Sequence, residues 1–327
     1  MGRSKFFYCL IISSFCIFCS SDALGQQDPQ FSLYNLNYLY YNPAYSGIEG
    51  VTKITAVHRS QWLGYDGTFE GRGDAPSTQV VSFTTPLFRF RSGVGAFFSR
   101  DDIGPLNNIE FNVSYAYHLA LKNSKVSFGV RAGIYSQSIN TPEYRAIIDP
   151  EFDPVLSPIT NGSDAQIRPD LAVGIYYQAE KYYVGISANH LTQSEFDFGV
   201  SPLKNPLESH GYFTAGYNYN FNYRIVLTPS ILVRTDFNQY NFDIGVSGVY
   251  DERIMGGISF RQGEAAILMV GYNLTKDKAL GINYAFDFVF VEQEAKSPTS
   301  HEFVVSYRLP VTVSGGKKVI RTPRFRH

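Results

Sequence analysis

The chain has 327 residues, a formal net charge of −1 and an aromatic content of 16%. The near-zero charge, with no long block of one sign, gives no indication of nucleic-acid binding. Its three cysteines, Cys9, Cys16 and Cys19, all lie near the amino terminus. Disulfides, thiolate metal sites and cysteine nucleophiles are therefore excluded from the rest of the chain.

The chain begins with the layout of a secretory signal peptide. Two basic residues precede an apolar run over 6–18, and small residues at 23–25 offer a cleavage site. The apolar run is too short and too often interrupted by serine to make a convincing membrane helix. A lipoprotein modification at Cys19 is the alternative, but Phe18 occupies a position where a small residue is expected. We therefore expect residues 1–25 to be removed as a signal peptide.

Strict alternation of apolar and polar residues over 109–119 is the clearest structural pattern. Apolar residues from Ile109 to Leu119 point one way, and polar residues such as Glu110 and His118 point the other. A period of two predicts a strand with one apolar and one polar face. The same pattern recurs about fourteen times, and no convincing amphipathic helix is present to cover the apolar faces. The expected strands span 51–58, 77–86, 92–100, 109–120, 124–137, 168–178, 182–190, 211–221, 225–234, 241–250, 253–261, 265–274, 279–288 and 301–309.

These strands predict an all-β fold, a transmembrane outer-membrane β-barrel of about 14 antiparallel strands whose apolar covering is lipid. The connections alternate in length, with a long one at 59–76 and a short one at 87–91. Outer-membrane barrels place short turns in the periplasm and long loops outside, so an even strand number puts both termini in the periplasm. A soluble β-sandwich is the alternative, in which the aromatic residues would fill a shared core.

Aromatic residues and glycines mark particular places on the strands. Aromatic residues at strand ends predict a girdle at the lipid–water boundary: Tyr115, Tyr117, Tyr176, Tyr177, Tyr217, Tyr219 and Phe221. Glycines recur on the predicted lumen face: Gly93, Gly95, Gly129, Gly133, Gly185, Gly245, Gly257 and Gly281. Such glycines either widen the lumen and let another segment approach the wall closely, or relieve the curvature that a barrel imposes.

Two segments flank the barrel, which we expect over 51–309. Residues 26–50 are rich in tyrosine and asparagine, and Asn-Pro-Ala at 42–44 breaks regular structure. This segment is predicted either to plug the lumen or to dock on the periplasmic rim. Residues 310–327 form a basic tail, predicted to be a solvated periplasmic end or a docking arm.

The sequence predicts no enzyme, no cofactor and no metal site. It contains no Gly-x-Ser-x-Gly nucleophile elbow. His118 lies on the lumen face, and His190 ends an outward-facing row, with Ser194 in the following loop; this is not a barrel lipase arrangement. Acidic residues at 149–153 lack the spacing of a calcium loop, and the prolines among them predict a stiff, solvated connection.

Short motifs in a fixed order carry a family resemblance. Residues 28–47 run from Asp-Pro-Gln-Phe-Ser-Leu-Tyr to Asn-Pro-Ala-Tyr-Ser-Gly, and 59–67 contain Arg-Ser-Gln-Trp followed by Gly and Asp-Gly. Ser-Tyr-Ala-Tyr-His at 114–118, Leu-Thr-Pro-Ser at 227–230 and Ser-His-Glu at 300–302 follow. Together they resemble the PorP/SprF family, outer-membrane proteins of the type IX secretion and gliding machinery of Bacteroidota.

The resemblance implies a non-enzymatic role in the secretion or surface anchoring of specific cargo, adhesins with a type B C-terminal sorting domain. It implies outer-membrane lipid, the type IX translocon, periplasmic components and the secreted adhesin as partners. One structured partner-binding motif is expected at the first external loop: Arg59, Gln61, Trp62, Asp66 and Gly67. Trp62 as a girdle residue is the alternative. The insertion of residues 68–74 departs from the family pattern, and it puts in doubt whether this loop contacts a partner as in relatives.

A function of another class stays open beside this one. A passive outer-membrane channel or a hydrophobic-solute transporter would use the same barrel. A lumen open to ions would favour that interpretation, whereas a lumen occluded by 26–50 or by a partner would count against it. A barrel phospholipase is a third interpretation, and it would require a lipid-facing serine nucleophile.

Overall fold

The computed structural model describes residues 28–64, 75–104, 106–139, 165–196, 205–290, 297–309, 311–313 and 317–319. The predicted signal peptide, the acidic residues at 149–153, and Asp66 and Gly67 lie outside these ranges. Within the described ranges, no helix is long and apolar enough to cross a membrane, a finding that does not concern crossing by strands.

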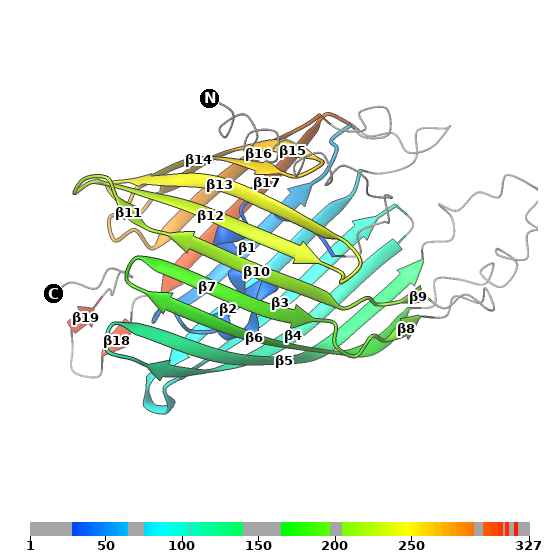
Figure 1. The fold of residues 1–327 in the computed structure, drawn as a ribbon, viewed down its shortest axis with the longest axis horizontal. Coiled ribbons are helices and arrows are strands. Elements are labelled where there is room, and N and C mark those ends of the chain that lie inside the picture. Colours follow the sequence, from blue (N-terminus) through cyan, green and yellow to red (C-terminus); the bar gives the residue numbers. More distant parts are fainter. Residues whose placement is uncertain are drawn as a thin grey trace, which may run out of the picture.

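One antiparallel sheet dominates the structure (Figure 1). It has 15 strands, and the two-residue β11 (Tyr219–Asn220) is a short extension beside β12, so fourteen strands form the wall. Those fourteen are β1 (Thr52–Ser60), β2 (Ser77–Leu87), β3 (Ser92–Ile103), β4 (Leu106–Ala120), β5 (Ser124–Ile139), β6 (Gln166–Ala179), β7 (Tyr182–Asn189), β10 (His210–Tyr217), β12 (Ile225–Thr235), β13 (Tyr240–Tyr250), β14 (Ile254–Arg261), β15 (Ala265–Asn273), β16 (Leu280–Val289) and β17 (Thr299–Leu309).

The sheet closes on itself. Strand β1 pairs with β17, the last strand of the wall, from Thr52 opposite Leu309 to Ser60 opposite His301. Strand β10 pairs with both β7 and β12, so the pairing continues around the whole wall. Closure leaves the wall without a free edge, and this satisfies the backbone polar groups that lipid cannot. The prediction of a 14-stranded antiparallel barrel is confirmed.

The two faces of each strand differ in chemistry as the alternation predicted. On β4, Phe111, Val113 and Tyr115 are exposed on the outer face, whereas Glu110 and Asn112 are buried on the inner face. Most other strands repeat the arrangement, with β12 half-buried along most of its length as the exception. Most of the large exposed hydrophobic side chains lie on wall strands. An apolar outer band around a polar interior is the surface that lipid hydrocarbon requires.

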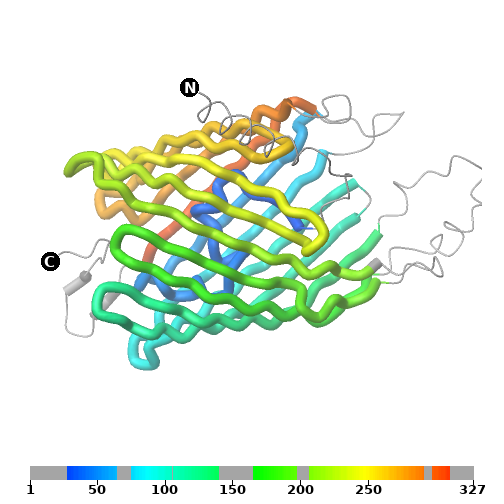
Figure 2. Tube along the Cα trace, viewed as in Figure 1, coloured from blue at the N-terminus to red at the C-terminus, as the bar shows by residue number. Residues whose placement is uncertain are grey.

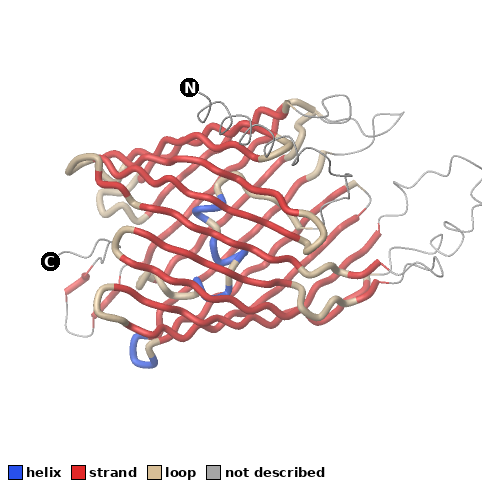
Figure 3. The backbone as a smooth tube through the Cα atoms, viewed as in Figure 1, coloured by secondary structure: helices blue, strands red, loops and turns tan. Residues whose placement is uncertain are grey.

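The remaining elements lie inside or at the ends of the barrel. Four short strands form two pairs outside the wall: β8 (Glu195–Phe196) with β9 (Asn205–Pro206), and β18 (Val311–Val313) with β19 (Lys317–Val319). Helix η3 (Phe88–Phe90) forms the turn between β2 and β3. Three short helices precede the wall: η1 (Tyr34–Leu36), α2 (Tyr38–Tyr41) and η2 (Pro43–Tyr45). Figure 3 shows these three inside the ring of strands.

Candidate functional site

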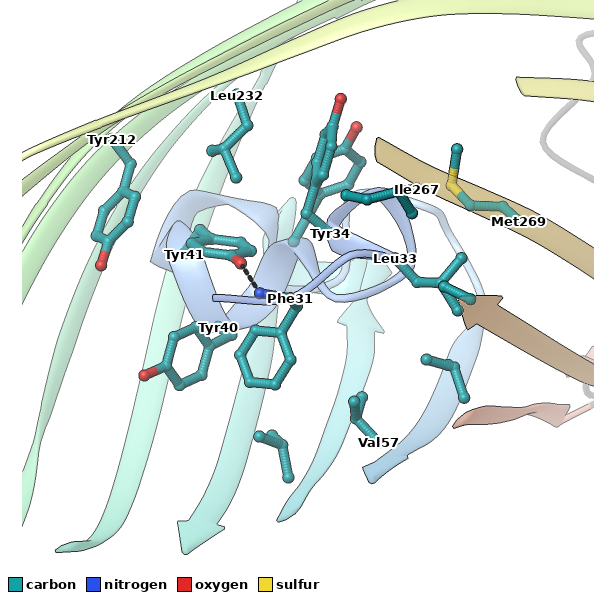
Figure 4. Close-up of a cluster of buried hydrophobic side chains, with 14 of the residues drawn as sticks. Phe31, Leu33, Tyr34, Tyr40, Tyr41, Val57, Tyr212, Leu232, Ile267 and Met269 are labelled. Atoms are coloured by element: carbon teal, nitrogen blue, oxygen red, sulfur yellow. Dashed lines mark hydrogen bonds between the residues drawn. The ribbon is translucent and has the colours of Figure 1, made fainter. Parts of the chain in front are cut away.

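Residues 28–50, called the plug from here on, fill the lumen. The trace in Figure 2 runs through the interior of the barrel before it enters β1. Phe31, Tyr40 and Tyr41 of the plug are buried and pack edge to face, with ring centroids 5.2 to 6.3 Å apart. The backbone amide of Phe31 donates to the Tyr41 hydroxyl at 3.3 Å (Figure 4). Each such buried ring contributes on the order of 2 kcal/mol of hydrophobic stabilisation, so the lumen contains a core of its own.

A charged clamp holds the first part of the plug. The carboxylate of Glu302 accepts the backbone amides of Ser32 and Leu33 at 2.6 and 2.9 Å. The guanidinium of Arg59 pairs with Asp287 at 2.8 Å and with Glu302 at 3.2 Å. The hydroxyl of Ser32 donates to Asp287 at 2.7 Å and accepts from Arg59 at 2.7 Å. Hydrogen bonds to ionised groups are the strong ones, and these are fully buried.

A second arginine extends the clamp along the wall. Arg261 donates to the Ser32 hydroxyl at 3.3 Å and lies 3.5 Å from Asp287. Its Nε pairs with Asp243 at 3.2 Å, and Asp243 in turn pairs with Arg234 at 2.9 Å. We call Arg59, Arg261, Asp287 and Glu302 the clamp. Alternating signs compensate these buried charges, which would otherwise be costly to remove from water.

Backbone carbonyl groups of the plug are bound by the opposite side of the wall. Arg131 donates to the carbonyl of Tyr40 at 2.7 Å, and its guanidinium lies 5.0 Å from the centre of the Phe97 ring. Ser187 donates to the carbonyl of Tyr41 at 2.8 Å. These are the last carbonyls of a one-turn helix, whose acceptors would otherwise lack partners.

Asn42 connects the plug to two neighbouring strands. Its side-chain amide donates to the carbonyl groups of Ile175 on β6 at 3.1 Å and Ile186 on β7 at 3.2 Å. Its side-chain oxygen accepts the backbone amide of Ala44 at 2.9 Å and so caps η2. The Asn-Pro-Ala motif that predicted a break in regular structure is therefore also a point of attachment.

The inner face of the wall carries glycines, and so no side chains, where η2 packs against it. We call these the glycine seat: Gly93 and Gly95 on β3, Gly129 on β5, Gly174 on β6 and Gly185 on β7. A Cβ on Gly129 would overlap the backbone of Ala44, and one on Gly93 would overlap the backbone of Ser46, each closer than 3.0 Å. For the predicted glycines Gly93, Gly95 and Gly129, the close-approach interpretation is correct. Gly174, which was not predicted, lies against Asn42 of the plug, whereas Gly185 lies closest to wall residues and only then to Asn42. The nearest neighbours of the other predicted glycines are wall residues instead: Gly133, Gly245, Gly257 and Gly281.

The end of the plug is held by a buried acid. Glu49 accepts from Lys53 at 2.9 Å and from the hydroxyl of Tyr45 at 2.7 Å, and Arg308 lies 3.9 Å away. Burial by itself would raise the pKa of Glu49, but Lys53 and Arg308 outweigh it and lower the pKa to about 2. Glu49 therefore remains ionised over the ordinary pH range and fixes the junction between plug and β1.

The sequence of this plugged barrel matches a known family. Residues 23–307 match the model described as type IX secretion system membrane protein PorP/SprF, which is most of the chain. The chain belongs to the PorP/SprF family. It is thus a type IX secretion system membrane protein built as an outer-membrane β-barrel. No curated protein sequence matches it.

Several solved outer-membrane structures resemble this PorP/SprF chain at low sequence identity. The Pseudomonas putida toluene transporter TodX is 12% identical, with a TM-score of 0.49 over 82% of this chain and 92% of that one. The Ralstonia pickettii toluene transporter TbuX is 13% identical, with a TM-score of 0.47 over 83% and 92%. The Acinetobacter baumannii outer membrane protein Omp33 is 8% identical, with a TM-score of 0.45 over 79% and 98%.

The residues of the predicted partner-binding motif of this PorP/SprF protein lie in different places in the structure. Arg59 is fully buried in the clamp, so its guanidinium serves the plug. Gln61 and Trp62 follow β1, where their backbone amides donate to the Pro76 carbonyl at 2.8 Å and to the Ser300 hydroxyl at 3.0 Å. Asp66 and Gly67 lie outside the described residues. A partner-binding role for this motif stays a prediction.

Two sequence interpretations of side-chain direction were wrong. Tyr176, assigned to the lipid girdle, is buried in the lumen, where its ring lies 5.3 Å from Tyr45 of the plug. Strict alternation turns it inward because its neighbour Tyr177 takes the outer face. His190 was assigned to an outward row but is buried, because its φ of +55° interrupts the alternation after β7.

The described part of the chain begins and ends its passage through the barrel at opposite ends, while the orientation of the two termini stays a prediction. Asp28 lies beside His190 and His210, at the strand ends where a long connection leaves the wall. Leu309 ends β17 at the opposite end, where it pairs with Thr52. The reason is that the plug traverses the lumen before β1 begins, which strand parity alone does not reveal.

Residues that hold the plug were mostly missed from the sequence. Ser32, Glu302 and Asn42 are within motifs that carried the family resemblance, but no local pattern connects them. Asp287 and Arg261 lie at inward-facing positions of their strands. Charged residues at inward-facing positions are the sequence signal that could have indicated a charged contact inside the lumen. The arrangement positions a polypeptide segment across the lumen.

Proposed function

We propose that this chain is an accessory and surface anchor of the type IX machinery, which assists the secretion or display of specific cargo. The proposed cargo is an adhesin with a type B C-terminal sorting domain. Membership of the PorP/SprF family supports a place in the secretion machinery. The role itself is non-enzymatic, because the barrel contributes binding surfaces.

The observation that carries the proposal is the filled lumen. Tyr40 and Tyr41 of the plug are buried within the ring of strands, and the clamp and the glycine seat hold opposite sides of the plug. A passive channel requires a continuous polar passage, and this filling opposes one. A barrel whose interior is occupied by its own chain is better suited to present surfaces at its two ends.

We assign one end of the barrel to the periplasm and the other to the outside by the length of the connections between strands. Short turns join β4 to β5 and β6 to β7 at one end, and the segments 61–76 and 190–209 leave the other. With short turns in the periplasm, the carboxyl terminus and the basic tail face periplasmic components of the machinery. The long connections then face outward and offer the surface for cargo. Asp28 lies at that outer end.

We further propose that Gln61 and Trp62 form the fixed base of the cargo surface. Their backbone is tied to Pro76 and Ser300, and the amide of Leu63 donates to the Thr299 carbonyl at 2.8 Å. A rigid base reduces the entropy lost when a loop binds a partner. This supports the sequence prediction for two of its five residues.

Affinity purification from detergent-solubilised outer membranes tests the anchor proposal. A tagged copy should retain a large secreted protein with a C-terminal sorting domain, or translocon components, above an unrelated tagged barrel. A tagged Trp62→Ala variant should fold normally yet retain less cargo. Recovery of the barrel alone under gentle conditions would count against the anchor.

A reversible lock on the plug separates the anchor from a channel. Unlike Gly93 and Gly129, Gly95 faces side-chain atoms: a Cβ there would lie 2.8 Å from both the Ser46 hydroxyl oxygen and a Leu39 methyl group. With Leu39→Ala to make room, the pair Ser46→Cys and Gly95→Cys is placed for a disulfide that leaves the plug backbone in position. The three native cysteines lie in the predicted signal peptide and do not interfere. For an anchor, cargo retention should be equal with the lock oxidised or reduced. Solute flux that appears only after reduction would favour a transporter instead.

A further inference from the structure

A cluster of buried metal-binding side chains lies where the plug begins. Asp28, His190 and His210 each offer one ligand atom, and these atoms lie within 4.8 Å of one another. The Nε2 atom of His190 is 3.0 Å from one carboxylate oxygen of Asp28, and the Nδ1 atom of His210 is 3.7 Å from the other. The Nδ1 atom of His210 also lies 3.0 Å from the Glu208 backbone carbonyl, to which it donates, so Nε2 is the ring atom of His210 that is left for an ion. The three side chains come from the plug, from the residue after β7 and from the start of β10.

The groups around this cluster are arranged as supports for metal ligands. The second ring nitrogen of His190 lies 3.1 Å from the carboxylate of Asp170, which is itself fully buried. The hydroxyl of Tyr212 donates to Asp28. Histidines that bind metals almost always give their other ring nitrogen to a carboxylate or carbonyl, which fixes the ring and increases its basicity. Asp170 stands in that relation to His190.

Charge at this end of the lumen also favours a cation. The carboxylates of Asp28, Asp170 and Glu110 are all buried there, and they interact electrostatically. The nearby guanidinium of Arg131 donates to the carbonyl of Tyr40. Buried carboxylates need compensating charge, and a divalent ion beside the His190 and His210 rings, whose centres lie 5.8 Å apart, would supply it.

We propose that Asp28, His190 and His210 bind a divalent transition-metal ion, with zinc as the best fit, which joins the start of the plug to the wall. Two imidazoles and one carboxylate suit zinc, whereas calcium and magnesium prefer oxygen ligands alone. Ligands about 2.0 Å from a tetrahedral ion lie roughly 3.3 Å apart, close to the His190–Asp28 separation. On binding, the ion replaces the proton between His190 and Asp28, and that proton is released. A water completes the coordination.

Zinc titration of the purified full-length barrel tests this site. The protein carries a tag without histidine and is first stripped with a chelator. Elemental analysis and calorimetry with zinc chloride should give one equivalent, and the unfolding midpoint should rise with zinc and fall back with chelator. His210→Gln should abolish both effects. Asp170→Asn, which changes only the support of His190, should weaken zinc binding by about 10- to 100-fold.

A matched variant controls for adventitious histidine binding. His58 lies on the outer face of β1, so His58→Gln should leave zinc binding and the midpoint shift unchanged. Folding of each variant is checked by its mobility on unheated gels. Should His210→Gln fail to fold, His190→Gln serves as the second ligand variant. Equal zinc binding by the wild-type protein and a folded ligand variant, or equal midpoint shifts with magnesium, would overturn the proposal.

Discussion

The two sides of the lumen wall hold the same plug by different physics. On the side of β1 and β14 to β17, the clamp residues Arg59 and Glu302 bind the plug through ionised groups. On the side of β3 to β7, Gly93 and Gly129 carry no side chain, and the plug backbone lies directly against the strands. The first side depends on charge and the second on shape.

Because of this difference, the two sides should respond to different kinds of substitution. A buried ion network fails when one partner is removed, since the other charge is left without compensation in a medium of low polarity. A glycine seat fails when a side chain is added, because the two backbones cannot separate without unseating the helix between them. Removing a charged side chain should therefore damage the clamp, whereas adding a side chain to a glycine should damage the seat.

The largest effect is expected from removing one charge of the clamp. Arg59→Met leaves Glu302 buried without its cationic partner and Asp287 with Arg261 alone, and should lower the free energy of unfolding by about 3–5 kcal/mol. Urea unfolding in detergent or lipid vesicles measures it. The matched control is Arg100→Met, whose pair with Asp102 is half exposed and should cost less than about 1 kcal/mol. Similar losses for the two variants would refute the clamp.

The next effect comes from adding a side chain to the seat. Gly129→Val places methyl groups in the volume of Ala44 and should cost about 1–3 kcal/mol. It should also expose the plug to added protease and raise single-channel conductance. Gly256→Val is the control, since a Cβ there meets nothing within 4 Å. If Gly129→Val keeps a protected plug and zero conductance, the close contact does not hold the plug.

A smaller effect is expected from the hydrogen bonds of Asn42. Asn42→Ala removes two donors to the β6 and β7 carbonyls and the cap of η2, at about 1 kcal/mol for each hydrogen bond. Hydrogen exchange of the plug amides should accelerate while that of β4 stays unchanged. The exposed turn residue Asn238 supplies the control variant Asn238→Ala. Uniform acceleration across the barrel would indicate global destabilisation rather than loss of this attachment.

The smallest effect is a pH dependence at Glu49. Its pKa is lowered to about 2, so its contribution to stability is complete above its unfolded value near 4.5 and is lost as the pH falls toward 2. The difference in unfolding midpoint between the wild-type protein and Glu49→Gln should therefore shrink between pH 5 and pH 2. A difference that stays constant with pH would show that the ion pair with Lys53 contributes nothing.

Much of the wall could be predicted because its signal is local. Alternation over 109–119 fixed the direction of Phe111 and Glu110 without knowledge of any partner strand. It failed for His190, where a positive φ changes the direction of the chain. At Tyr176 the alternation held, and the error was to assign an inward tyrosine to the girdle because it lies near a strand end. Turn conformation and the neighbours of a side chain are not encoded in a period of two.

The sequence alone indicated only separate parts of the candidate site. The tyrosine-rich segment at 26–50 indicated two possible places, lumen or rim, and its composition fits both equally. Clamp residues Arg59 and Glu302 are 243 positions apart in the chain, and the proposed metal ligands Asp28 and His190 are separated by 162. Spacing rules for catalytic or metal motifs detect ligands that are close in sequence, so such sets remain invisible to them.

The sequence by itself determined the alternating strands, their number and the chemistry of the two faces, because each of these depends on neighbouring residues. The tertiary structure alone decided that the plug fills the lumen, that the clamp and the glycine seat oppose each other, and that Asp28 meets His190. Those features arise when closure of the barrel brings distant strands around one interior. Their energy comes from contacts that exist only after the wall has closed.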